Sequence, residues 1–165
     1  MKYWILIGLL PLTLTLPAAA LAQRIAKRPF KGANVILLNT DESAVYSLQL
    51  LATVCRKQGY TIDSLTQDIL ITTYRPEVAQ QVDRQGSAPY RFTAVVAMKR
   101  GGATALILWA TRQEQDTDGR LVERQIKWNK PSNNSPDTAC FIRAQQLALA
   151  YPNGLVRYSK EKLKY

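Results

Sequence analysis

Apolar runs and apolar stripes alternate along this chain, and their order predicts a mixed fold. Residues 33–39 contain four consecutive aliphatic side chains, which is typical of a strand covered by other elements. Hydroxyl and acidic residues at 40–43 then favour the start of a helix. From Val45 to Cys55 apolar side chains recur at helical spacing, and Gly59 follows, as glycine often does just past a helix. This region therefore predicts a strand followed by a helix.

The middle of the chain predicts two antiparallel hairpins. Alternating residues at 60–65 and a β-branched run at 69–74 flank a polar turn. The second hairpin is predicted from residues 90–99 and 103–112. The glycine pair 101–102 between them can adopt the positive φ angles that a two-residue hairpin turn requires.

This glycine turn sets the predicted register of the second hairpin. Val96 then faces Ile107, and Phe92 and Trp109 lie on the same, core-facing side. The opposite face is also apolar, whereas a solvent-exposed antiparallel face usually carries polar residues. We expect the polar stretch 76–89 or a partner to cover it. The predicted patch consists of Val95, Ala97, Leu106 and Leu108.

The last third of the domain predicts a strand, a helix and a short final extended segment. The strand covers residues 121–128, and residues 135–137 (Ser-Pro-Asp) are a typical helix start. An apolar stripe runs from Cys140 to Tyr151, and residues 155–158 can form a short strand. The predicted order is β-α-β-β-β-β-β-α. It predicts an α+β fold, a mainly antiparallel sheet of about five or six strands with two helices on one face.

The first 22 residues have the pattern of a cleavable export signal. Lys2 is followed by an apolar run over residues 4–16 and by Ala20-Leu21-Ala22, which fits signal peptidase. The run is shorter than the ~20 apolar residues that a membrane-spanning helix needs, which disfavours the alternative of a transmembrane anchor. No cysteine precedes Cys55, so a lipid anchor is not expected. We expect an exported, periplasmic or secreted protein that begins at Gln23.

The remaining chain divides into a basic mobile arm (23–32), one domain (33–158) and a basic tail (159–165). The whole chain has a net charge of +10, and such a basic domain is attracted to anionic surfaces. The predicted contacts with an anionic surface are Arg24, Lys27, Arg28, Lys31, Lys160, Lys162 and Lys164.

The sequence excludes several kinds of chemistry. It contains no histidine, so histidine metal ligands, histidine bases and Ser-His or Cys-His pairs are absent. The acidic stretch 114–119 resembles the start of a calcium loop, but Gln125 stands where the bidentate acid belongs, and we interpret it as a hairpin turn. We predict no metal and no cofactor. Cys55 and Cys140 lie on helical apolar stripes, and export predicts a disulfide between them; the alternative is two buried thiols.

One resemblance bears on function. Gly59-Tyr60-x-Ile62, followed by Asp68-x-x-Ile71-Thr72-Thr73, resembles small exported envelope-lipoprotein-type domains of the BamC-like kind, over residues 35–74. The lipid-attachment cysteine of those domains is missing here. The resemblance implies a non-catalytic interaction module and carries over no catalytic residue.

The expected function is binding of an envelope protein or of an anionic envelope polymer or lipid surface. The alternatives are a small carboxylate-dependent hydrolase and a polyanion or nucleic-acid binder. Export removes nucleic acid as the usual partner.

Overall fold

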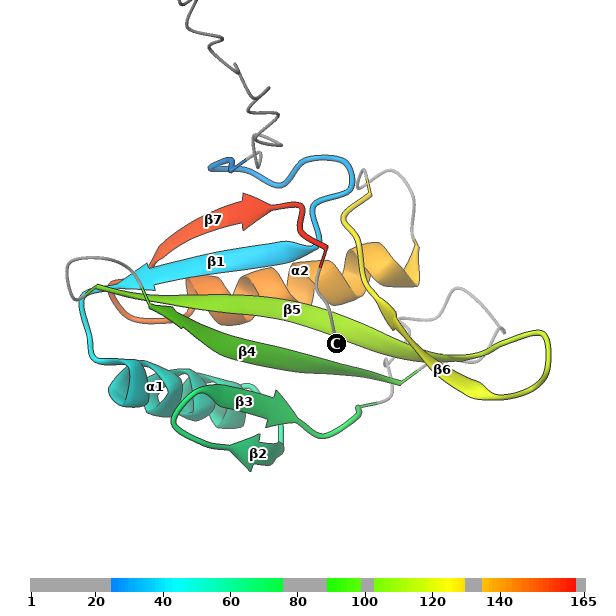
Figure 1. The fold of residues 1–165 in the computed structure, drawn as a ribbon, viewed down its shortest axis with the longest axis horizontal. Helices are drawn as coiled ribbons and strands as arrows, with labels where there is room; N and C mark the ends of the chain where they lie inside the picture. Colours follow the sequence, from blue (N-terminus) through cyan, green and yellow to red (C-terminus); the bar gives the residue numbers. More distant parts are fainter. Residues whose placement is uncertain (1–24, 76–88, 99–102, 130–134, 163–165) are drawn as a thin grey trace, which may run out of the picture.

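Seven antiparallel strands and two helices make up the described part of the chain (Figure 1). The computed structural model describes residues 25–75, 89–98, 103–129 and 135–162. The predicted export signal and most of the predicted cover at 76–89 lie outside these residues. The α+β class is confirmed, and the sheet contains one strand more than expected.

The centre of the sheet is the long strand β5 (Thr104–Gln115). Strand β4 (Tyr90–Met98) pairs along one side of it. On the other side, β1 (Val35–Thr40) pairs with the first half of β5 and β6 (Leu121–Gln125) with the second half. Two strands that are about 80 residues apart in sequence therefore lie end to end along one neighbour.

The sheet continues outward from both sides of this centre. The predicted first hairpin forms β2 (Ile62–Leu65) and β3 (Ile69–Thr72), and β3 pairs with β4. At the opposite edge, β7 (Leu155–Ser159) pairs with β1 and is the seventh strand. The order across the sheet is β2-β3-β4-β5-β1-β7, with β6 attached to β5.

Both predicted helices form where their capping residues indicate. Helix α1 (Ala44–Lys57) is followed by Gly59 at φ +80°, a conformation that glycine adopts without strain. Helix α2 (Pro136–Leu149) begins with the Ser135 hydroxyl accepting a hydrogen bond from the Thr138 N–H, at 3.2 Å. The helices pack on the same face of the sheet and share one core with it.

Two aromatic groups fill this core. Tyr60, Tyr90 and Phe92 stack edge to face, with ring centroids 5.1–6.5 Å apart. At the other side of the core, Phe141 of α2 lies 5.4 Å from Trp128 and 6.2 Å from Tyr158. Phe141 thereby links α2 to the sheet, and Tyr90 and Phe92 lie on the internal face of β4.

The predicted register of the β4–β5 hairpin is wrong by one residue. Ile107 faces Val95 rather than Val96, and Val96 faces Leu106. Five residues lie between Met98 and Thr104, the last observed pair. A two-residue turn would leave an even number of residues between facing partners, so the turn is not the predicted one. The faces of β4 stay as predicted, but those of β5 are exchanged.

This shift divides the predicted partner patch. Leu106 and Leu108 are 0 % and 1 % exposed and belong to the core beneath the helices. Val95 and Ala97 lie on the other face of the sheet and are half-buried. The four residues therefore do not form one surface.

Leu108→Lys should unfold the domain, because it places a charge in the core where no partner can reach it. We expect a loss of roughly 3–5 kcal/mol in the free energy of unfolding, measured by urea denaturation. Ile107→Lys, next in the chain but on the opposite, half-buried face, is the control and should cost about 1 kcal/mol. Equal stabilities of the two variants would contradict the observed register.

Candidate functional site

The basic arm forms the outer border of the sheet beside β7. The Ala26 N–H donates to the Tyr158 carbonyl, and the Ala26 carbonyl accepts the Tyr158 N–H, both at 2.9 Å. Further along, the Gly32 N–H donates to the Trp128 carbonyl, at 2.9 Å, and Phe30 packs against the core. We expected the arm to be mobile, but from Ile25 onward it is hydrogen-bonded to the domain.

The basic tail is attached by a buried asparagine. The Nδ2 of Asn34, just before β1, donates to the Gln125 Oε1 at 2.9 Å and to the Glu161 carbonyl at 2.7 Å. Its Oδ1 accepts the Glu161 N–H at 2.9 Å. Gln125 in turn donates to the Asn34 carbonyl, at 3.3 Å. A residue at the start of the domain therefore holds the segment that follows its last strand.

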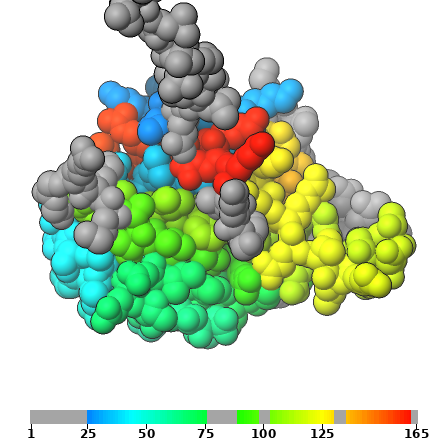
Figure 2. Space-filling model, viewed as in Figure 1, coloured from blue at the N-terminus to red at the C-terminus, as the bar shows by residue number. Residues whose placement is uncertain are grey.

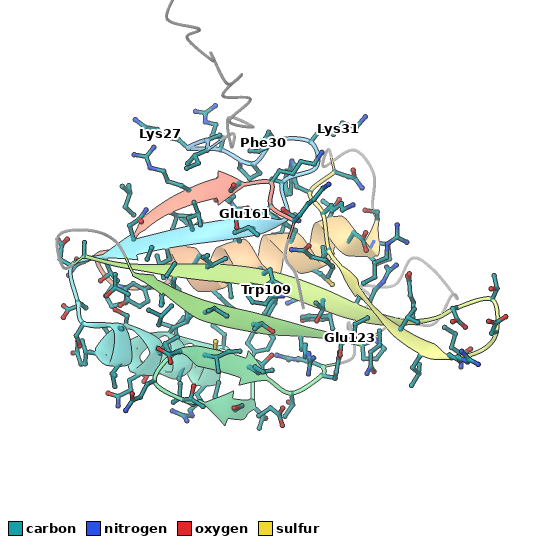
Figure 3. The ribbon with its side chains drawn as sticks, in the orientation of Figure 1. Lys27, Phe30, Lys31, Trp109, Glu123 and Glu161 are labelled. Atoms are coloured by element: carbon teal, nitrogen blue, oxygen red, sulfur yellow. The ribbon has the colours of Figure 1, made fainter. Side chains whose placement is uncertain are left out.

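These attachments bring the arm and the tail together. Figure 2 shows the blue arm and the red β7 region side by side on the upper rim, and Lys27 and Lys31 extend from that rim in Figure 3. A Cβ atom at Gly32 would lie 3.8 Å from the Cδ of Lys160, so the tail lysine crosses the arm there. We call this surface the basic edge. Its described cations are Lys27, Arg28, Lys31, Lys127, Arg157, Lys160 and Lys162.

Five of the seven predicted contact residues belong to this basic edge, whereas Arg24 and Lys164 lie outside the described residues. Sequence reasoning missed Lys127 and Arg157. Lys127 precedes Trp128, which bonds to Gly32 and Ala33, and Arg157 lies within β7. Their proximity follows from strand pairing, so only the topology could reveal it.

The basic edge has few opposite charges. Glu161 carries the carboxylate within the tail, and its backbone is held by Asn34. The ion pairs found among the described residues use Arg91, Arg112 and Arg124, none of which belongs to the basic edge. The lysines of the basic edge are exposed, so their ammonium groups are open to an anionic ligand.

The carboxylates that do converge are bound by an arginine. Arg112 contacts Glu114 at 2.9 Å and Asp137, in the first turn of α2, at 3.0 Å. The hydrogen bond from Arg112 lowers the pKa of Glu114. A general acid needs a raised pKa, so this cluster is suited to fixing α2 on β5 rather than to hydrolysis.

The acidic turn is a hairpin turn, as interpreted. The Asp116 Oδ1 accepts the N–H groups of Asp118 and Arg120 at 2.9 and 2.8 Å, and Gly119 has φ +76°. Its carboxylate oxygen is thus used for the turn itself. Within the described ranges, no group of three or more potential metal ligands comes together.

The predicted Cys55–Cys140 disulfide is not present in the described part of the chain. Both cysteines are buried, one on each helix, and pack in the core as small apolar side chains. Burial raises the pKa of the Cys55 thiol to about 12, so its reactive thiolate is disfavoured in the folded protein. The alternative of two buried thiols describes the structure.

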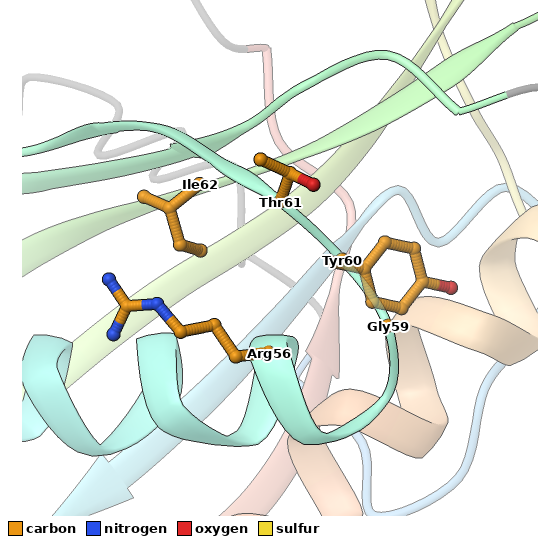
Figure 4. Close-up of a pocket in the computed structure, with 5 residues that line it drawn as sticks. All are labelled: Arg56, Gly59, Tyr60, Thr61 and Ile62. Atoms are coloured by element: carbon orange, nitrogen blue, oxygen red, sulfur yellow. The ribbon is translucent and has the colours of Figure 1, made fainter.

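Two shallow hollows lie among the described residues at the opposite edge of the sheet. A shallow cavity of about 460 Å³ is bordered by Arg56 of α1 and by residues 59–62, which lead into β2 (Figure 4). A smaller one, of about 210 Å³, adjoins it and includes Arg75, which donates to the carbonyls of Gln58 and Gly59. Neither lining contains a carboxylate or a thiol, so these hollows offer no acid–base pair.

Comparison with known proteins matches this chain to no protein family and to no curated protein. Neither helix in the described part of the chain has the length and apolar character needed to cross a membrane. The basic edge is therefore the candidate functional site among the described residues.

Asn34→Leu should release the tail from the domain. It leaves the Glu161 N–H and carbonyl without their buried partner, and we expect a loss of about 2–4 kcal/mol in stability. Hydrogen exchange at the Glu161 amide should accelerate. Gln125→Leu is the control, because it removes one partner of Asn34 but leaves the bonds to Glu161. Unchanged protection of Glu161 in Asn34→Leu would show that this asparagine does not hold the tail.

The thiols should be unreactive in the folded protein. With Ellman's reagent in mildly alkaline buffer we expect no reaction of Cys55 until a denaturant is added, when both cysteines react. The pKa of Cys55 in the folded protein lies above its ordinary value of 9.0, so the folded state holds the thiol proton more tightly than the unfolded chain does. The resulting contribution to stability is fully present below pH 9 and is lost as pH rises toward about 12. A Cys55–Cys140 linked peptide in non-reducing maps would contradict the structure.

Proposed function

We propose that the protein is an exported, non-catalytic module that binds an anionic component of the cell envelope through its basic edge. The observation that carries this proposal is the convergence of arm and tail. Cations of the arm and of the tail lie beside β7. The ion pairs of Arg91 and Arg112 lie elsewhere in the domain. The export signal pattern supports the location, and the high net charge supports the class of ligand.

The backbone attachments of the arm make this surface suited to binding. Ala26 and Gly32 are hydrogen-bonded to the domain, so the lysines between and beside them start from a fixed backbone. A ligand then has to order side chains but not the chain itself, which reduces the entropic cost of association. Exposed charges are screened by salt, so binding should weaken steeply as ionic strength rises.

The two alternative functions have less support. A hydrolase needs a carboxylate free to accept or donate a proton, whereas Glu114 and Asp137 share Arg112. A single-stranded nucleic-acid binder usually presents aromatic rings on an open sheet face. The rings of Tyr60, Tyr90 and Phe92 are instead packed against one another in the core.

Charge reversal on the basic edge should weaken binding to heparin, a soluble polyanion. We expect Lys31→Glu/Lys160→Glu to lower the affinity roughly tenfold or more, measured by titration calorimetry at low salt. The matched control is Lys57→Glu/Arg120→Glu, which changes the net charge equally on α1 and the acidic turn. An equal effect of both pairs would show that only net charge matters and would overturn the proposed site.

A further inference from the structure

We propose that the anionic component is the surface of a lipid bilayer, and that Ile25 and Leu155 enter its headgroup region while the surrounding cations contact the lipid phosphates. This inference rests on the proposed function and names its ligand. It is carried by the position of two exposed aliphatic side chains within the basic edge.

Ile25 and Leu155 are exposed aliphatic side chains beside the cations of the basic edge. Ile25 is 52 % exposed and directly precedes Ala26, which pairs with Tyr158. Leu155 is 53 % exposed and begins β7. The two side chains therefore lie near opposite ends of the ladder formed by the arm and β7, with basic residues along it.

The cations of the basic edge lie away from both hollows described above. The shallow hollows described above lie beside β2, at the opposite edge of the sheet from β7. Lys27 and Lys31 extend from the border of the sheet (Figure 3), while Arg157 lies within β7 and Lys160 directly follows it. Such an elongated array fits an extended charged surface better than a single small anion.

The combination of charge and aliphatic side chains distinguishes a bilayer from a soluble polymer. A polysaccharide or nucleic-acid backbone can neutralise the lysines but leaves Ile25 and Leu155 in water. A bilayer provides both anionic headgroups and an apolar layer just beneath them, and peripheral proteins use the two together. Phe30 is half-buried and packed on the core, so it anchors the arm and is not available for insertion.

Vesicle flotation tests this inference on the protein isolated after export by its own host, with its N-terminus identified by mass spectrometry. The probes are vesicles of phosphatidylcholine alone and vesicles with roughly 30 % phosphatidylglycerol. We expect binding to the anionic vesicles only. Comparable binding to neutral vesicles would overturn the role of the cations.

The variant Ile25→Ser/Leu155→Ser separates the bilayer from other polyanions. It should weaken binding to the anionic vesicles about tenfold and leave binding to heparin unchanged. The control is Leu65→Ser/Leu121→Ser, which removes exposed leucines of β2 and β6, 37 % and 67 % exposed, away from the basic edge. Thermal unfolding verifies that all variants fold, and Ile25→Ala/Leu155→Ala is the milder substitute if the serine variant does not.

The outcomes distinguish the two proposals. Binding to heparin without binding to anionic vesicles would overturn the bilayer and leave the proposed function standing. If the protein binds neither heparin nor anionic vesicles, both the proposed function and the bilayer inference are overturned. Wild-type vesicle binding by the Ile25/Leu155 variant would overturn the insertion of these side chains.

Discussion

The pairing of β5 with three other strands is the constraint on which the rest of the structure depends. On one side β5 pairs with β4, beyond which the β2–β3 hairpin lies. On its other side it pairs with β1 and β6, which lie end to end. Because β1 in turn pairs with β7, the position of β5 determines where both ends of the domain lie. The helices then cover the face on which Leu106 and Leu108 point inward.

The buried amide of Asn34 completes this arrangement. It connects the start of β1, the end of β6 and the residues after β7 through short hydrogen bonds. A buried polar group is tolerated only when its partners are present, so this side chain specifies one geometry for three segments. The electrostatic character of the basic edge is a consequence: two basic segments far apart in sequence are held at one border of the sheet.

Local patterns of the sequence predicted local structure well. The Ser135 cap, the glycine after α1 and the first hairpin all depend on interactions within a few residues. The inward and outward faces of β5 were predicted wrongly. They depend on whether the β4–β5 connection has an odd or an even number of residues, and the glycine pair suggested an even number. The basic residues themselves could be identified from composition. That these residues come together, with Arg157 and Lys127 among them, could not be predicted, since it results from hydrogen bonds between segments far apart in the sequence.

The bridge between Ala26 and Tyr158 also protects the sheet from unwanted association. An uncovered edge strand presents free N–H and carbonyl groups that can pair with another chain and start aggregation. Here the arm occupies part of the outer side of β7 and places exposed lysines there, and charged side chains at a sheet edge disfavour such pairing. The opposite edge is protected differently, since β2 has only four residues and an irregularity between Ile62 and Ser64. The segment that carries the charge is thus also a cover for the backbone, and a chain shortened past Ala26 would lose this cover but keep Lys27, Arg28 and Lys31.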